Sequence, residues 1–141
     1  MSMFPEDVDL LFPADGGCFG CSESNADGLR MRFRRRGEMV FTEFAVPDRF
    51  HGAPGIAHGG IVATMLDEVS CACAVFVRDE RVVTGELSIR YQQPCPVDAP
   101  IRLEARIADE HPRYFVIAAQ VTREGVVLAL STGKFFKDSR Q

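Results

Sequence analysis

The fold is decided by residues 50–77, FHGAPGIAHGGIVATMLDEVSCACAVFV, in which a glycine-rich loop runs into a long apolar segment. From about Gly60 to Val77 the apolar residues recur with the period of an α-helix, and five of them share one face at about 100° per residue. These five are Ile61, Met65, Val69, Ala72 and Phe76. The segment is the chain's only long helical pattern and is apolar nearly all round, so it predicts one helix that is mostly buried.

Six segments outside this helix alternate apolar and polar residues, as half-buried strands do. They are residues 29–34, 40–46, 86–92, 101–107, 115–122 and 126–136. Two strands, one helix and four further strands predict an α+β fold, with an antiparallel sheet of about six strands wrapped around one long central helix. One helix cannot cover both faces of such a sheet, so we expect a second copy of the chain and a homodimer at least.

The composition is that of one globular domain spanning residues 1–141, with an irregular segment over 1–28 where prolines and glycines are frequent. Apolar residues make up 46% of the chain, and the net charge of −4 disfavours binding to nucleic acid. The N-terminus is acidic where a signal peptide is basic. The carboxylates of Asp67 and Glu68 interrupt the most apolar stretch, which disfavours a membrane span. Five cysteines, an odd number, do not suggest a secreted disulfide framework, so we expect a cytoplasmic protein.

The glycine-rich loop meets the predicted helix at His58, Gly59 and Gly60. The first N–H groups of a helix have no partner within it and carry partial positive charge. Glycine lets a ligand approach this backbone closely. The terminus therefore suits an anion or a developing oxyanion, although a plain tight turn is the alternative reading.

Two acidic residues, Asp67 and Glu68, lie in the middle of the apolar helix. Burial of a carboxylate without partners is costly, so an acidic pair in a core helix indicates chemistry more strongly than one on a solvated face. Asp67 shares a stripe with Gly60, Thr64 and Cys71, apart from the main apolar stripe, and we expect it to be functional. Glu68 is expected to reach solvent or to pair with an arginine.

Nine residues separate His58 from Asp67, which is about 13 Å along a helix at about 1.5 Å per residue. Both cannot touch one reacting carbonyl over that distance. If both act on one substrate, two helices must lie antiparallel, as a two-fold dimer would place them.

The sequence resembles the hotdog-fold thioesterase superfamily, in particular the acyl-CoA thioesterases of the phenylacetate-pathway type. The resemblance rests on His58-Gly59-Gly60, on Asp67 nine residues after the histidine, and on the strand order around them. It extends to Gly28-Leu29 and to residues 83–94, VTGELSIRYQQP, and covers residues 18–136.

The resemblance implies an enzyme that hydrolyses acyl thioesters of coenzyme A, sometimes of acyl carrier protein, and needs no metal or redox cofactor. It implies dimers that pair their sheets edge to edge, and in many members a dimer of dimers. It also assigns roles to five residues. These are Asp67 as general base or nucleophile, the Gly59 N–H with help from Gly60 to polarise the thioester carbonyl, His58 to orient the loop or the thioester, and Thr84 to hold the hydrolytic water.

Two departures from the family pattern leave alternatives open. Many members carry Asn or Gln six residues before the histidine, where this chain has Gly52 with His51 beside it. No residue is therefore assigned to position the hydrolytic water or the leaving group. The carboxylate is also doubled, so Glu68 is the alternative to Asp67 as the working group.

Two other functions remain as alternatives to hydrolysis. A hotdog dehydratase or hydratase of acyl thioesters could pair His51 with Glu68, although their separation of seventeen residues does not match that family's pattern. A non-catalytic acyl-CoA-binding module is the other. An aspartate in the working position, Asp67, favours catalysis over binding alone.

Cys18 and Cys21 have the spacing of a metal-ligand pair. The chain has no second such pair and only three histidines, so we do not expect a four-ligand zinc site. A packed pair of thiols is the expected arrangement.

Overall fold

The computed structural model describes residues 8–10 and 17–140 of the chain. Within these ranges one α-helix, α1, spans Gly59–Arg78, and a 3-10 turn, η1, spans Asp48–Phe50. The strands are β1 (Val8–Leu10), β2 (Phe33–Arg36), β3 (Met39–Ala45), β4 (Val82–Tyr91), β5 (Pro100–Glu110), β6 (Tyr114–Arg123) and β7 (Val126–Lys137).

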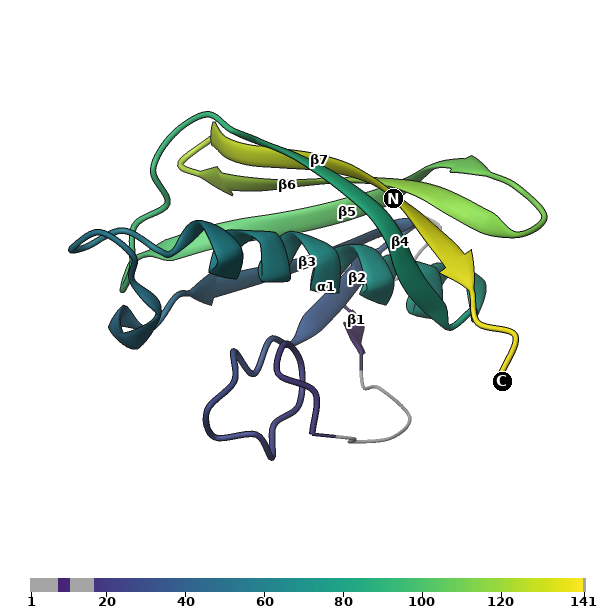
Figure 1. Ribbon diagram of the computed structural model, residues 1–141, viewed down its shortest axis with the longest axis horizontal. Coiled ribbons are helices and arrows are strands. Elements are labelled where there is room, and N and C mark those ends of the chain that lie inside the picture. Colours follow the sequence, from purple (N-terminus) through teal and green to yellow (C-terminus); the bar gives the residue numbers. More distant parts are fainter. Residues whose placement is uncertain (1–7, 11–16, 141) are drawn as a thin grey trace.

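The strands form one antiparallel sheet that curls around α1 (Figure 1). Their order across the sheet is β1-β2-β3-β5-β6-β7-β4, so the strand that follows the helix in sequence ends the sheet on one side. The predicted α+β arrangement of one long helix inside an antiparallel sheet is confirmed.

The sheet has one strand more than the six predicted from sequence. The segment over residues 1–28, predicted to be irregular, contributes β1, which pairs with β2 so that Val8 lies opposite Arg35. Three residues are too few to show a periodic pattern, so this strand could be found only from its pairing.

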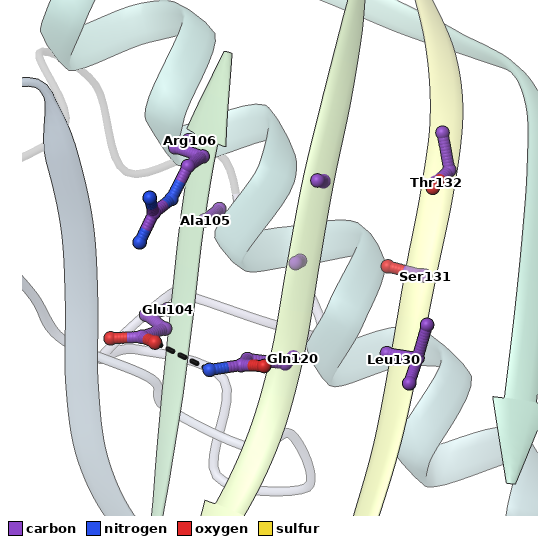
Figure 2. A pocket seen from close by; sticks show the side chains of 9 residues that line it. Glu104, Ala105, Arg106, Gln120, Leu130, Ser131 and Thr132 are labelled. Carbon is purple, nitrogen blue, oxygen red and sulfur yellow. Dashed lines mark hydrogen bonds between the residues drawn. The ribbon is translucent and has the colours of Figure 1, made fainter. Parts of the chain in front are cut away.

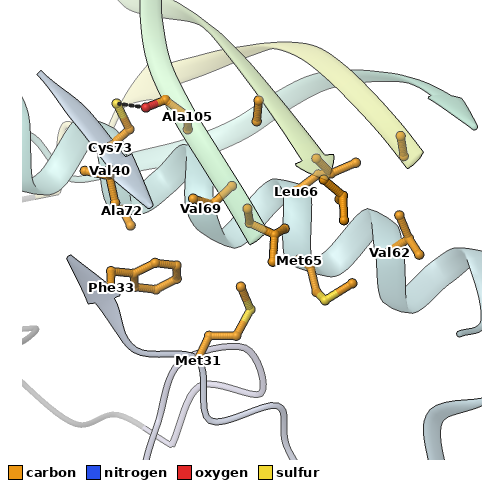
Figure 3. Packing of buried hydrophobic residues seen from close by; sticks show 14 of the residues in the cluster. Met31, Phe33, Val40, Val62, Met65, Leu66, Val69, Ala72, Cys73 and Ala105 are labelled. Atoms are coloured by element: carbon orange, nitrogen blue, oxygen red, sulfur yellow. Dashed lines mark hydrogen bonds between the residues drawn. The ribbon is translucent and has the colours of Figure 1, made fainter. Parts of the chain in front are cut away.

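The helix begins and ends within one residue of its predicted bounds. It ends at Arg78 and is capped by Asp79, which has left-handed backbone and whose N–H donates to the carbonyls of Ala74 and Val75. The buried face includes the predicted Met65, Val69 and Ala72, which lie among side chains of the sheet (Figure 3). By length and apolar composition α1 would suffice to cross a membrane, but here this face packs into the hydrophobic core.

The predicted strand at residues 29–34 has the expected alternation but begins later. Leu29, Met31 and Phe33 are buried and the arginines between them are exposed, yet the strand starts only at Phe33. The N–H groups of Leu29 and Met31 donate instead to the carbonyls of Phe19 and Gly20, at 2.7 and 2.9 Å. These bonds hold the loop of residues 17–28 beside the sheet and close to α1.

The edge strand β4 is irregular at the point where it approaches the helix. Its pairing with β7 shifts between Thr84 and Glu86, which leaves Gly85 as a bulge. A Cβ at Gly85 would overlap the Phe136 ring, so glycine is needed there. The bulge carries Thr84 at the exposed edge of the sheet.

A buried hydroxyl without a partner predicts a stabilising substitution. Among the described residues, Ser131 Oγ is the buried side-chain polar atom that lacks a hydrogen bond. Leaving such a group unpaired costs about 1–3 kcal/mol, so Ser131→Ala should raise the free energy of unfolding by about 1 kcal/mol in urea denaturation. Ser70, equally buried but donating to the Leu66 carbonyl at 2.8 Å, is the matched control, and Ser70→Ala should not stabilise. Equal effects of the two substitutions would contradict this account.

Candidate active site

The start of α1 is capped by a histidine. His58 lies in extended backbone, with φ −58° and ψ 138°, and its Nδ1 accepts the Gly60 N–H at 2.8 Å. The bond satisfies one of the first-turn donors, as a capping side chain does, and leaves the hydrogen of the neutral ring on Nε2. Gly60, expected to help Gly59 polarise a carbonyl, therefore gives its N–H to His58 in this structure.

Gly59 presents the free donor of this terminus. No residue in the described part of the chain accepts its N–H, while its carbonyl accepts the Tyr91 hydroxyl at 2.7 Å. Tyr91, at the end of β4, was not singled out from sequence, because a half-exposed tyrosine on a strand carries no signal of its role. Gly59, Val62 and Tyr91 border a cavity of about 320 Å³ beside the helix terminus. A ligand in this cavity could reach the Gly59 N–H.

The carboxylate of Asp67 is held by the edge strand. Thr84 Oγ1 donates to Asp67 Oδ1 at 2.6 Å, so the structure brings together two residues that the resemblance assigned to the site. The hydrogen of Thr84 is used in this bond, which leaves the lone pairs of its oxygen to accept from water. Cys71 Sγ lies 3.8 Å from the same hydroxyl oxygen. Burial and the charge of Asp67 raise the pKa of Cys71 to about 12, so this neighbour stays a thiol.

Glu68 faces a different environment from Asp67: its side chain is partly exposed, and it pairs with no arginine in the described part of the chain. Its Oε1 accepts from Cys18 Sγ at 3.5 Å, and its stem packs on Gly20. The loop of residues 17–28, tied to residues 29 and 31, covers this side of the helix. Burial raises the pKa of Glu68 above its ordinary value, the bond from Cys18 lowers it, and the charge of Asp67 raises it.

The structure does not bring together His51 and Glu68 within the chain. His51 Nδ1 lies 2.6 Å from the Asp48 carbonyl in the turn η1. The Glu68 carboxylate, on α1, accepts instead from Cys18 in the loop of residues 17–28. The neighbouring Gly52 packs on His58, and a Cβ there would lie 3.2 Å from the His58 Cα. An Asn or Gln at this position would press on the residue that caps the helix.

The two parts of the site lie apart on one chain. Eight residues of helix separate Gly59 from Asp67, which is about 12 Å at about 1.5 Å per residue. Each part is nevertheless bonded to β4, Asp67 through Thr84 and Gly59 through Tyr91. The free N–H and the carboxylate therefore stand at the two ends of one exposed edge strand.

A further pocket lies on the sheet and contains none of these residues. It has a volume of about 240 Å³, and Gln120 Nε2 donates to Glu104 Oε1 at 2.6 Å in its wall (Figure 2). The rest of its lining consists of alanines together with Arg106, Leu130, Ser131 and Thr132. It contains none of the residues singled out from the sequence, so the helix terminus and Asp67 are the candidate site.

A comparison with protein families gives one match. The family model described as "Thioesterase superfamily" matches residues 54–130. This range contains α1 with His58, Gly59, Asp67 and Glu68, and reaches through β4 to β7.

Curated relatives match over part of their length. The human acyl-coenzyme A thioesterase THEM5 is 32% identical over 88 residues, which are 61% of this chain and 35% of the relative. The acyl-coenzyme A thioesterase THEM4 of Xenopus laevis is 30% identical over 70 residues, which are 50% of this chain and 31% of the relative. The chain thus aligns with about a third of the length of each.

Solved structures share the architecture over most of the chain. A thioesterase superfamily protein has a TM-score of 0.73 at 26% identity and covers 81% of this chain and 56% of its own. A phenylacetic acid degradation-related protein from Ralstonia eutropha has a TM-score of 0.70 at 18% identity, with coverages of 83% and 92%. A Streptococcus mutans protein bound to acetyl-CoA has a TM-score of 0.68 at 19% identity, with coverages of 98% and 93%. These likenesses show that the fold is the hotdog fold.

Proposed function

The chain belongs to the thioesterase superfamily, and we propose that it hydrolyses acyl-CoA thioesters to the free acid and CoA. The observation that carries the proposal is the position of two groups on β4. At one end Thr84 holds the carboxylate of Asp67, and at the other Tyr91 holds the helix terminus that presents the Gly59 N–H. A base and an oxyanion donor are the two parts that hydrolysis of a thioester needs.

Each group has a definite task in the proposed reaction. The thioester carbonyl oxygen accepts the Gly59 N–H, which stabilises the negative charge that grows there during attack. Asp67 takes a proton from a water held by Thr84, and the water oxygen adds to the carbonyl carbon. The C–S bond then breaks, and CoA leaves as a thiolate that takes up the proton from Asp67. Direct attack by Asp67, with water opening the resulting anhydride, is the alternative route to the same products.

A second copy of the chain completes the proposed site. The outer edge of β4 is the end of the sheet, and its Val83 and Tyr91 are 49% and 54% exposed. Antiparallel pairing of two β4 strands about a two-fold axis between Leu87 and Ser88 would set Thr84 of one chain opposite the partner's Tyr91. The Asp67 of one chain then faces the Gly59 terminus of the other. We propose this homodimer, alone or as a dimer of dimers.

The proposed activity is tested by following free CoA with a thiol reagent. The substrates are acetyl-, medium-chain, long-chain and aryl-acyl-CoA and an acyl carrier protein thioester; the aryl members probe the phenylacetate-type specificity that the resemblance implies. Turnover of at least one acyl-CoA is expected. A parallel assay follows loss of enoyl absorbance with an enoyl-CoA. Hydration without CoA release, or no turnover on any substrate, would overturn the proposal.

The two-chain site predicts complementation between inactive variants. Asp67→Asn removes the carboxylate and Gly59→Pro removes the N–H donor. When the two are unfolded together and refolded in equal amounts, about a quarter of the wild-type activity should appear. Half of randomly assembled dimers are mixed, and each mixed dimer has one intact site of two. Mixed dimers that form but stay inactive, detected by differently tagged chains, would show that the site does not cross the interface.

A further inference from the structure

A group of potential metal ligands lies around Glu68, whose side chain is turned about 100° around the helix from that of Asp67. One ligand atom each from Cys18, Cys21 and Glu68 lies within 4.8 Å of the others. In a tetrahedral zinc site, with bonds of about 2.0–2.3 Å, ligand atoms stand about 3.5–3.8 Å apart. The three groups therefore need to close by about 1.3 Å at most to share one ion.

We propose that Cys18, Cys21 and Glu68 bind a zinc-class divalent cation that clips the N-terminal loop to α1. Two sulfurs and one carboxylate suit Zn²⁺, whereas Mg²⁺ and Ca²⁺ take oxygen ligands. Three protein ligands leave the fourth position of the ion to water. The site is separate from the proposed hydrolysis and does not depend on it.

The backbone of the cysteine turn, residues 18–22, holds the Cys18 side chain in place. The Gly20 N–H donates to Cys18 Sγ at 3.3 Å, and the Ser22 N–H donates to the Cys18 carbonyl at 3.0 Å. The first of these bonds is made to the proposed ligand atom itself. The same bond fixes the direction of the ligand, as outer hydrogen bonds do in established metal sites.

Glycine at position 20 is what allows the helix carboxylate to reach this turn. A Cβ there would overlap the Cγ of Glu68. The Gly20 carbonyl accepts the Met31 N–H at 2.9 Å, which ties the turn to the residues that lead into β2. The ligands thus come from two segments fifty residues apart that the fold already holds in place.

The arrangement separates the two neighbouring carboxylates by role. Glu68 accepts from Cys18, while Asp67 accepts from Thr84. Asp67→Asn is therefore the matched control for Glu68→Gln: each removes one carboxylate charge from adjacent positions, but only Glu68 is a ligand.

The test measures metal directly and does not use turnover. The reduced protein is stripped with a chelator, exchanged into chelator-free buffer and titrated with Co²⁺, followed by the near-ultraviolet charge-transfer band of cobalt–thiolate bonds. Zn²⁺ is then used to displace the cobalt. We expect one cobalt per chain and loss of the band on addition of zinc. Zinc content of the protein as purified, by mass spectrometry, provides a second measure.

Variants locate the ion. Loss of a group that only supports a ligand lowers metal affinity by about 10–100-fold, so Glu68→Gln and Cys21→Ser should each weaken binding at least tenfold. Gly20→Ala keeps all three ligands but pushes on Glu68, and should weaken binding as well. Asp67→Asn should bind as the wild type does. Far-ultraviolet circular dichroism identifies any variant that does not fold.

The proposal is overturned by any of three results. The first is wild-type protein that takes up neither cobalt nor zinc under reducing conditions. The second is binding by folded Glu68→Gln as tight as that of Asp67→Asn. The third is a cobalt–thiolate band that persists when Cys18 and Cys21 are both serine.

Discussion

Asp67→Asn should lower kcat by about 10²–10⁴-fold, the contribution typical of a general base, while acyl-CoA binding persists. Asparagine keeps the size of the side chain and an oxygen that can accept the Thr84 hydroxyl. It cannot take a proton from water at neutral pH, nor form an anhydride. Steady-state kinetics on the best acyl-CoA of the panel, together with KM, measures the effect.

The matched control for Asp67→Asn is Glu68→Gln. Because the Glu68 side chain accepts from Cys18 and not from Thr84 of β4, its replacement should cost much less in kcat. Thermal denaturation shows whether each variant is folded. A folded Asp67→Asn with near-full activity beside an inactive Glu68→Gln would move the role to Glu68. Activity in both variants would mean that the helix carboxylates are structural.

Gly59→Pro should lower kcat by about 10²–10³-fold, the loss typical when one oxyanion donor is removed. Proline at the first position of a helix is well tolerated, because its missing N–H has no partner within the helix. His58, at φ −58° and ψ 138°, already has the extended backbone that the residue before a proline adopts. The substitution therefore removes the proposed donor while the helix and its cap remain.

Gly59→Ala is the control that keeps the N–H. A Cβ at this position would lie 3.8 Å from the Tyr91 hydroxyl oxygen, an ordinary contact. Activity close to that of the wild type is expected from alanine, in contrast to proline. If both variants lose activity equally, activity depends on the free space beside Gly59 and not on its N–H. If Gly59→Pro is folded and fully active, Gly59 is not the oxyanion donor.

The helix is the element that could be predicted most completely from sequence. The apolar residues of the segment 60–77 recur with the helical period, which can be seen without knowing the rest of the chain. The observed helix, Gly59–Arg78, differs from the predicted range by one residue at each end. The alternation at residues 29–34 likewise predicted correctly which side chains are buried. It did not predict where the strand begins, because the N–H groups of residues 29 and 31 are taken by a loop about ten residues earlier in the chain.

The candidate site could be predicted from sequence only in part. Asp67 and the terminus at Gly59 were singled out from the residues, and Thr84 only from a resemblance. The structure adds that Asp67 and Thr84 are hydrogen-bonded and that the Tyr91 hydroxyl donates to the Gly59 carbonyl. Periodicity places Asp67 and Glu68 about 100° apart on the helix, but it does not predict which part of the chain packs against each side chain.

Local sequence patterns predicted a long helix with a buried apolar face, where that helix starts, and which side chains of residues 29–34 are buried. These follow from local periods of about 3.6 and 2 residues, which each segment carries independently of the others. Only the tertiary structure decided that β4 supports Asp67 and that the cysteine turn meets Glu68. The partners in these contacts are seventeen and fifty residues apart in sequence. Contacts over such separations depend on how the sheet curves and on where a loop is hydrogen-bonded to the rest of the chain. Neither can be predicted from the local order of apolar and polar residues.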